Sequence, residues 1–300
     1  MEVKQLEAFI RVAELGSFSR AATALDVSQS VLSRQVGQLE IELGRHLLHR
    51  HGRGVTTTAA GKRFLAHSLG IVRQLAAARE ELQAEETSPL GHVIIGLPPR
   101  IASTFAARFV MGFRTAFPKA TLRIVEGPTA AIHDWLLLGR VDLGLLNNPP
   151  PTPQLHCELV YAEDFHLVAG RAGSVALPRT VALRTLHRYP LILPGRPHAV
   201  RNLLDDVCQR RRVTLDIALE IDPIEAILEL VREGLGYCIL TRNSISADDR
   251  FQSARITAPA VTNQLVVGTP VQRAMSALVR RTAALLAREA RAVAPPDSYG

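Results

Sequence analysis

Apolar residues recur at every third or fourth position near the start of the chain, which is the period of an α-helix. Over residues 3–15 they share one helix face, and Gly16 would end that helix as a left-handed cap. The apolar residues of this face are Leu6, Phe9, Ile10 and Ala13. We expect this helix to back the two helices that follow, so that the three share one core.

Residues 19–43 predict those two helices, joined by a tight turn. Ser19 is the expected N-cap of the first helix, and Ser28 is the expected N-cap of the second. The apolar stripe of the second helix consists of Leu32, Val36, Leu39 and Leu43. A short capped helix, a turn and a second amphipathic helix are typical of a helix-turn-helix, although an ordinary amphipathic helix with a solvated face would show the same stripe.

The opposite face of the second helix carries short or polar side chains and one arginine, which suits contact with DNA bases and phosphates. It consists of Gln29, Ser30, Ser33, Arg34, Gly37 and Gln38. We expect contacts to base edges and nearby phosphates from Gln29, Ser30, Ser33 and Arg34. The DNA backbone is the expected partner of Ser28 and Gln38.

Two short β-prone pieces, 47–48 and 55–57, flank a turn that contains two glycines. The pattern predicts a two-stranded wing with Arg50 and Arg53 at its tip, where they would bind phosphates or enter a minor groove. A basic surface hairpin without a DNA partner is the alternative. No metal site is expected, because further Cys or acidic ligands are missing around His46, His49 and His51.

A long helix is expected from Thr58 to about Glu86. Its apolar residues form a narrow seam: Leu65, Leu69, Val72, Ala76 and Leu82. Because such a seam needs a partner helix, we expect residues 59–88 to be a linker that forms a homodimer. Two winged modules on a dimer would bind the half-sites of a DNA palindrome. Residues 87–91 break the helix and mark a domain boundary.

Strand and helix patterns alternate after residue 91, which predicts a parallel sheet covered on both faces. The expected strands are 92–98, 121–127, 141–147, 165–170, 190–195, 214–221, 236–240 and 265–268. The expected helices are 101–117, 130–138, 198–211, 224–233 and 275–292. Two such α/β halves leave a cleft between them, where small ligands bind near strand carboxyl ends and helix N-termini.

The chain is therefore expected to be multidomain. A mostly α winged helix-turn-helix domain would span 1–58, the linker helix 59–88 and a two-lobed α/β domain 91–300. The expected limits of lobe I are 91–162 with 267–300, and those of lobe II are 163–266.

The net charge of +7 suits an anionic partner. Eleven of the Lys and Arg residues, against six acids, lie within residues 1–79, so most of the excess is at the helix-turn-helix end. The chain begins without a basic region leading into an apolar run and has no apolar stretch long enough to span a bilayer. We therefore expect a cytoplasmic protein with no membrane partner.

Three cysteines, Cys157, Cys208 and Cys238, are widely spaced and form no CxxC motif. This spacing suits a reducing compartment and burial as small apolar side chains, with a redox switch as the alternative.

Catalysis is not expected, because the chain lacks GxSxG, HExxH, a Walker loop and GxGxxG. We therefore assign no catalytic residue and no cofactor. A solute-binding transport protein would share the two lobes but would require export. A nonspecific architectural DNA binder would not need an α/β domain with a cleft.

The whole chain resembles the LysR-type transcriptional regulators. The resemblance rests on residues 6–44, on LLHR at 47–50, on VTTTAAGKRFL at 55–65 and on segments of the α/β part that include ELVREGLGYCILTR. It implies a DNA-binding activator or repressor whose effector domain is similar to periplasmic solute-binding proteins. It also implies a homotetramer built as a dimer of dimers. RNA polymerase is a further possible partner, since a regulator bound to operator DNA could expose or occlude polymerase according to where the operator lies.

Two strand-to-helix connections in lobe I are expected to bind the small-molecule effector. The helix after Pro98 and Pro99 would point its N-terminal amides at the cleft, and the helix that Thr129 caps would do the same. By resemblance, Arg100 and Thr129 match positions that contact effectors in family members with aromatic-acid ligands. Further candidates are Ser103, Thr104, Asn147, Arg196 and His198.

Two arginines at one cleft favour a small organic anion such as a carboxylate. The alternative for Arg100 and Arg196 is a salt bridge across the cleft or exposure to solvent. For Ser103 and Thr104 the alternative is simple helix packing.

Overall fold

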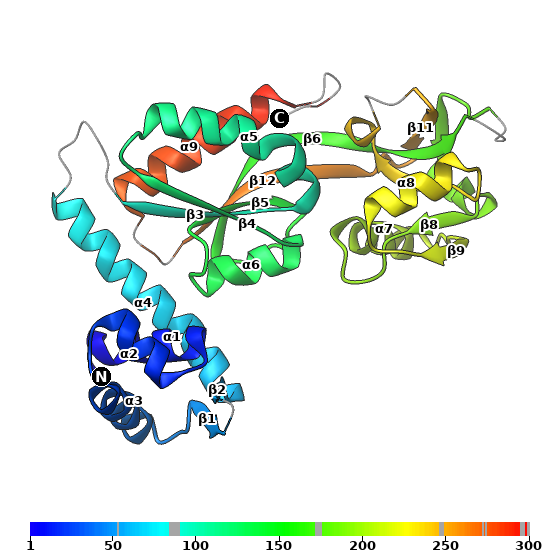
Figure 1. The fold of residues 1–300 in the computed structure, drawn as a ribbon. Helices are drawn as coiled ribbons and strands as arrows, with labels where there is room; N and C mark the ends of the chain where they lie inside the picture. The colour runs from blue at the N-terminus through cyan, green and yellow to red at the C-terminus, as the bar shows by residue number, and fades with distance from the viewer. Residues whose placement is uncertain are drawn as a thin grey trace.

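A computed structural model describes residues 1–52, 54–83, 91–171, 176–245, 249–271, 273, 275–294 and 298. A small helical domain lies at the N-terminus, and a long helix joins it to an elongated α/β domain with two lobes (Figure 1). Arg53 and most of the expected domain boundary at 87–91 lie outside the described residues.

The N-terminal domain is built from helices α1, α2 and α3 and a short hairpin of strands β1 and β2 (Figure 1). Their bounds are α1 Val3–Leu15, α2 Phe18–Leu25, α3 Gln29–Leu43, β1 Leu48–His51 and β2 Gly54–Thr57. The core contains Phe9 of α1 and three fully buried residues of α3, Leu32, Val36 and Leu39. The helix-turn-helix, the wing and the cap at Gly16 therefore form as expected.

Two details of this domain differ from the sequence prediction. The N-cap of α2 is Ser17 and not Ser19, because the Ser17 hydroxyl accepts the hydrogen bond from the Arg20 amide. Leu43 was expected in the buried stripe but is 37% exposed, since α3 ends at this residue and extends past the core.

Helix α4 (Ala59–Gln83) leaves the hairpin and packs along α1, with Phe64 against the ring of Phe9 at a centroid separation of 5.5 Å. Its middle also meets the α/β domain. Gly70 lies against the Leu138–Gly139 turn, so closely that a Cβ on Gly139 would stand 2.9 Å from the Gly70 Cα atom. The linker helix and lobe I are thus in van der Waals contact within one chain.

Lobe I is a sheet with helices on both faces (Figure 1). Its strands follow the order β4 (Thr121–Glu126), β3 (His92–Leu97), β5 (Leu143–Asn147), β12 (Thr262–Pro270) and β6 (Leu155–Gly170). Helices α5 (Pro99–Ala116) and α9 (Ala277–Ala292) cover one face, where Phe105, Phe109 and Phe113 fill the core. Helix α6 (Thr129–Leu137) covers the other.

Lobe II is joined to lobe I by β6 and β12, which run through both (Figure 1). Its strands are β7 (Thr180–Ala182), β8 (Leu191–Leu193), β9 (Ile217–Glu220), β10 (Cys238–Thr241) and β11 (Phe251–Thr257). Its helices are α7 (Ala199–Arg211), α8 (Ile224–Arg232) and the 3-10 turns η1 (Leu183–Arg188) and η2 (Arg242–Ser244).

The expectation of a parallel sheet is confirmed for only part of the molecule. Strands β3, β4 and β5 are parallel, but β12 runs antiparallel to β5 and β6, and β10 and β11 run antiparallel to β6. The chain crosses to lobe II along β6 and returns along β12, so these two crossings must point in opposite directions. Among the described residues, no helix is both long and apolar enough to cross a membrane.

Candidate DNA interface and interlobe site

The outer face of α3 is accessible. Ser28, Gln29, Ser30, Arg34 and Gln38 are exposed, and Ser33 is half-buried. The Ser28 hydroxyl accepts a hydrogen bond from the Val31 amide at 3.3 Å, which confirms it as the N-cap of α3. Arg34 and Gln38 form no hydrogen bond or ion pair with another described residue, so their polar groups are available to a partner.

The wing is tied to α3 through Arg50. The guanidinium of Arg50 lies 4.5 Å from the centroid of the Phe18 ring and donates a hydrogen bond from Nη1 to the Ser33 hydroxyl at 3.1 Å. The structure thus brings together two of the expected DNA-binding side chains from different elements. Arg53, the other wing arginine, lies outside the described residues.

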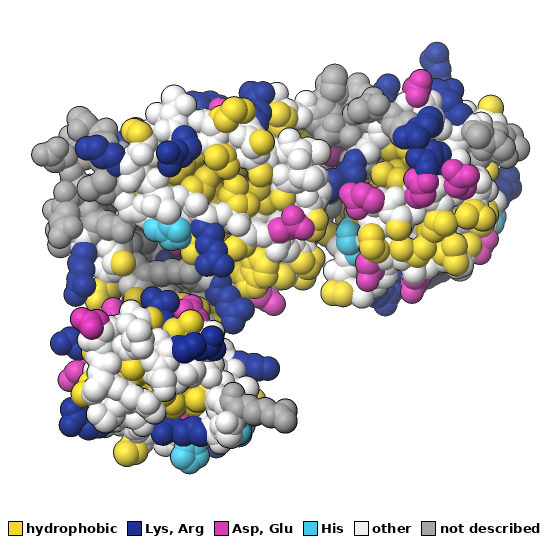
Figure 2. Space-filling model, viewed as in Figure 1, with side chains coloured by type: hydrophobic (Ala, Val, Ile, Leu, Met, Phe, Trp, Pro, Cys, Tyr) yellow, Lys and Arg dark blue, Asp and Glu magenta, His cyan; other side chains and the backbone are white. Residues whose placement is uncertain are grey.

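Lys and Arg side chains are spread over the visible surface of this domain (Figure 2). Within the described residues, no group of three or more His, Cys, Asp or Glu side chains is arranged to hold a metal ion.

Arg100 is the second residue of α5 and spans the two lobes. Its guanidinium donates a hydrogen bond to the backbone carbonyl of Ser244 in η2, and Nη1 lies 3.9 Å from the Glu225 carboxylate of α8. Burial lowers the pKa of Arg100, and the carboxylates of Glu225 and Glu163 oppose that effect. This is the cross-cleft ion pair that the sequence left open as the alternative.

Three of the other lobe I candidates are held by hydrogen bonds within lobe I. The hydroxyls of Ser103 and Thr104 donate to the Arg100 carbonyl of their own helix, at 2.9 and 3.0 Å. Thr129 is not the cap of α6, because Pro128 occupies that position and the Thr129 hydroxyl accepts a hydrogen bond from the Asn147 amide at 3.2 Å. The structure therefore brings Thr129 and Asn147 together at the end of β5.

The Asn147 side chain belongs to a small cluster of side-chain amides beside the strands that cross between the lobes. Asn263 of β12 donates to the Asn147 side chain at 3.3 Å and accepts from the Asn148 side chain at 2.7 Å. Asn148 adopts a left-handed backbone with φ 45° and accepts a hydrogen bond from the Gln264 amide. Asn148 and Asn263 carry no local sequence signal for this cluster, because they meet only through strand pairing across more than a hundred residues.

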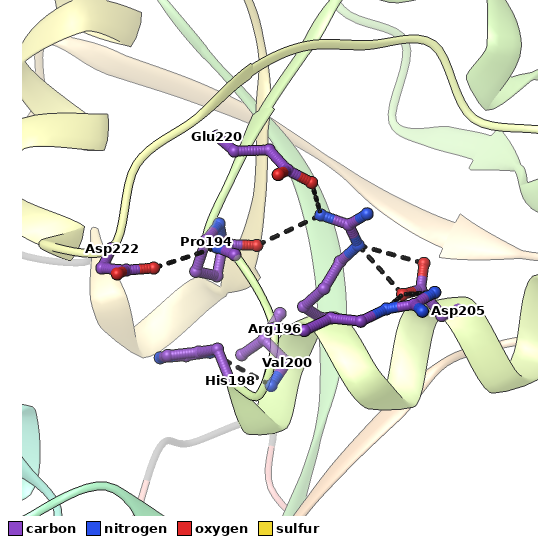
Figure 3. Close-up of polar contacts among 9 residues, drawn as sticks. Pro194, Arg196, His198, Val200, Asp205, Glu220 and Asp222 are labelled. Atoms are coloured by element: carbon purple, nitrogen blue, oxygen red, sulfur yellow. Dashed lines mark hydrogen bonds and ion pairs between the residues drawn. The ribbon is translucent and has the colours of Figure 1, made fainter.

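In lobe II, Arg196 does not share a described partner with Arg100. Figure 3 shows Arg196 directed at Asp205 of α7, which it contacts at 2.7 Å. Asp205 also binds Arg201 at 3.0 Å, and Arg201 donates to Glu220 and to the Pro194 carbonyl. Arg201 is buried and was missed, since a single arginine inside an amphipathic helix carries no sequence signal for such a role.

His198 is the N-cap of α7, and its Nδ1 accepts a hydrogen bond from the Val200 amide at 3.3 Å. This hydrogen bond requires an unprotonated Nδ1. Burial lowers the pKa of His198, and the Asp222 carboxylate opposes the shift. The imidazole is thus maintained in the state that can cap the helix.

The three cysteines all lie in the described part of the chain as free thiols. Cys208 and Cys238 are buried as expected, whereas Cys157 is exposed. Desolvation raises the pKa of Cys157, that of Cys208 to about 11 and that of Cys238 still further. Such thiols are poor nucleophiles at neutral pH, since the thiolate is the reactive form.

A helix-turn-helix with a wing, followed by a linker helix and a two-lobed α/β domain, defines a DNA-binding protein with a ligand-binding domain. Residues 3–62 match the bacterial regulatory helix-turn-helix protein, lysR family, and residues 86–291 match the LysR substrate binding domain. The chain therefore belongs to the LysR family of transcriptional regulators. These proteins bind operator DNA and small-molecule effectors, and they are regulators rather than enzymes.

Relatives align over nearly the full chain. A probable hydrogen peroxide-inducible genes activator of Streptomyces viridosporus is 31% identical over 95% of this chain and 93% of its own length. A full-length variant of OxyR from Pseudomonas aeruginosa superimposes with a TM-score of 0.76 at 22% identity, over 97% and 95% of the two chains. CbnR in complex with its target DNA gives a TM-score of 0.56 at 25% identity, over 97% and 100%.

Proposed function

We propose that the chain regulates transcription in the cytoplasm by binding a dyad-symmetric operator through α3 and the wing. Base edges and nearby phosphates would be contacted by Gln29, Ser30, Ser33 and Arg34. Ser28, Gln38, Arg50 and Arg53 would hold the DNA backbone. The accessible polar face of α3 carries this proposal, and the likeness to CbnR, whose structure was solved with its target DNA, supports it.

The proposed effector is a small organic anion bound between the lobes at Arg100. Arg100 stands in the first turn of α5, where the helix dipole and the amides of residues 100 and 101 favour negative charge. Pro99 contributes no amide, so the guanidinium supplies most of the attraction. Thr129 and Asn147 line the neighbouring strand end and add hydroxyl and amide groups.

Arg196 and His198 are proposed to complete the site from lobe II. Arg196 is exposed at its ion pair with Asp205, so it can exchange that carboxylate for one on the effector. Ser103 and Thr104 are exposed on α5 beside Arg100 and would contact only the outer end of a ligand.

Effector binding would act on the arrangement of the lobes. An anion at Arg100 competes with Ser244 and Glu225, which belong to lobe II. The ligand would therefore favour one interlobe arrangement over another, which is a population shift. Because α4 touches lobe I at Gly139, a change in lobe I also reaches the helix that carries the DNA-binding domain.

We propose a homodimer that assembles further into a homotetramer. A groove of about 530 Å³ lies between α5 and the edge strand β4, lined by Val110, Arg114, Ala120, Thr121, Leu122 and Ile124. Hydrophobic side chains gather there on the surface (Figure 2), and Met111 next to it is 67% exposed. A second copy would bury this face, while the α4 seam would pair the linkers at 59–88.

Peroxide sensing by a thiol is the alternative that the name of the Streptomyces relative raises. The elevated pKa values of the three thiols disfavour it, because peroxide reacts with thiolates. The interlobe anion site is therefore the better supported means of control.

The proposal is tested with the full-length protein and duplex DNA from upstream of its own gene. DNase I footprinting should show one protected dyad, and a panel of organic acids such as benzoate and succinate should alter the protection. Calorimetry with the same acids should show binding that Arg100→Ala weakens about tenfold to a hundredfold. Equal binding to wild type and Arg100→Ala would exclude Arg100 as the anion site.

A further inference from the structure

The first turn of α2 contacts side chains on the DNA-facing surface of other elements. Ser17 caps this turn, so Phe18 and Ser19 are its first two residues. Phe18 points into the core and is 8% exposed, whereas Ser19 is on the surface. Each reaches a different side chain that the proposed function assigns to DNA.

Ser19 holds the amide of Gln29. Its hydroxyl donates a hydrogen bond to Gln29 Oε1 at 3.0 Å, across the turn between α2 and α3. The Ser19 hydroxyl thereby takes one of the two lone pairs of the amide oxygen, and no other hydrogen bond to a described residue uses the two N–H donors of the amide nitrogen. A glutamine that reads adenine uses both the oxygen and the nitrogen of its amide. Gln29 is instead prepared to act as a donor.

The bases that present acceptors in the major groove are guanine, through O6 and N7, and thymine, through O4. A Gln29 that has both donors available and its oxygen already partly engaged therefore favours guanine or thymine at the base that it meets. Adenine offers one acceptor there, N7, beside an amino group that would repel the donors of Gln29.

Phe18 holds the guanidinium of Arg50. The ring supports the guanidinium at 4.5 Å, and Arg50 uses one of its five N–H donors on Ser33. The stacked and hydrogen-bonded plane has little freedom to rotate, so its other donors keep one direction. Arg50 would then bind DNA beside Ser33 without the entropy cost of ordering its side chain on binding.

We propose that Phe18 and Ser19 are positioning residues for DNA recognition: Ser19 sets Gln29 as a donor toward base edges, and Phe18 fixes Arg50 beside Ser33. The inference rests on the proposed function, in which α3 is the recognition helix. It adds a base preference and two residues that need not touch DNA themselves.

The role of Ser19 is tested by in vitro selection, in which the full-length protein captures the duplexes that it binds from a library with a randomised core. The wild type should enrich a dyad, and the positions whose preference collapses in Gln29→Ala identify the base that Gln29 reads. Guanine or thymine is expected there. Ser19→Ala should relax that preference or admit adenine, with the other positions unchanged, and Ser19→Thr should restore it.

Thr23→Ala is the matched control, because the Thr23 hydroxyl donates to the Ser19 carbonyl within α2 and, among the described residues, bonds no side chain assigned to DNA. A Ser19→Ala motif identical to the wild-type motif at every position overturns the role of Ser19. If the wild type enriches no motif at all, the proposed function fails as well, so the two failures are distinguishable.

The role of Phe18 is tested with the selected duplex and a double-mutant cycle. Arg50→Lys keeps the charge but loses the planar stack, and we expect it to weaken binding about twofold to fivefold. In Phe18→Leu the same Arg50→Lys change should have almost no further effect. Independent, multiplicative losses overturn the coupling.

Phe18→Leu removes a buried ring, so its thermal unfolding is recorded alongside. The cycle between Ser33→Ala and Arg50→Ala involves side chains outside the buried core and does not depend on that core substitution. It should show the same coupling, and additive losses there count against the proposal even if Phe18→Leu is unstable.

Discussion

The Arg100 guanidinium of lobe I donates a hydrogen bond to the Ser244 carbonyl of lobe II. These residues are 144 positions apart in the sequence, and they meet because β6 and β12 carry the chain from one lobe to the other and back. A ligand that takes the guanidinium must alter this contact. The proposed recognition of an anion and the proposed change in lobe arrangement are therefore one event.

Replacing Arg100 with alanine should weaken anion binding about tenfold to a hundredfold, the range expected for loss of a charge-assisted hydrogen bond. The chain has one tryptophan, Trp135, whose ring packs against Gly127 at the connection leading to Thr129. Its fluorescence should therefore report a titration with benzoate or another acid from the panel. Arg108→Ala, on the same helix but paired with Glu289, should leave the titration unchanged.

Replacing Arg34 with alanine should weaken operator binding by on the order of 1–3 kcal/mol. The side chain is exposed on α3 and forms no contact that would hold the fold together among the described residues. Gel-shift titration measures the loss. Lys119→Ala removes one positive charge from lobe I instead, and a loss of similar size in that variant would show that only net charge matters.

The stability that comes from the His198 cap should be lost in acid. Because burial lowers its pKa below the usual 6.5, the folded state favours neutral imidazole. The contribution is fully present above pH 6.5 and declines as pH falls through the lowered value. Thermal unfolding of wild type should show this decline, and His198→Asn, a cap that does not titrate, should lack it. If the unfolding temperatures of wild type and His198→Asn depended on pH in the same way, the His198 cap would not be the source of the decline.

The thiols should be unreactive at neutral pH. The pKa of Cys208 is raised to about 11 by burial, with Asp205 adding to the shift, so its thiolate fraction becomes appreciable only in alkali. Hydrogen peroxide should leave operator binding unchanged, and mass spectrometry should find the three cysteines reduced. Loss of DNA binding that Cys157→Ser prevents would point to a redox switch at the exposed thiol.

Gly139 should be less tolerant of alanine than Gly44. Both have left-handed φ, +69° and +62°, but only a Cβ on Gly139 meets other atoms, namely those of Arg273 and Gly70. Gly139→Ala should therefore lower the free energy of unfolding by about 1–3 kcal/mol more than Gly44→Ala does. Chemical denaturation measures the difference. Equal losses would indicate that α4 does not press on this turn.

The local elements of the fold could be predicted because their signals are local. The apolar faces of α1 and α3, the cap at Ser28 and the glycine after α1 are all visible within a few residues. Strand β6 was recognised only over 165–170, although it begins at Leu155. Within its first half a run of exposed residues is followed by a run of buried residues. The sequence there shows neither an alternating nor a continuous apolar pattern.

The residues of the candidate sites likewise divide into those with a local sequence signal and those without one. Arg100, Thr129 and Asn147 could be named because each stands at the junction of a strand and a helix. The partners that give them their present roles, Ser244 and Asn263, come from distant segments. The same holds for Phe18 under Arg50, since an aromatic residue in a helix is predicted only as part of the core.

The most direct test of the central claim is the ratio of two affinities at physiological salt. Fluorescence anisotropy would compare full-length protein on its upstream dyad with the same protein on a scrambled duplex of equal length. Specific regulators bind their site on the order of a thousandfold or more tightly than random DNA. We predict a ratio in that range that shifts when the organic acid panel is added. Equal affinity for the two duplexes, with or without the acids, would contradict the account.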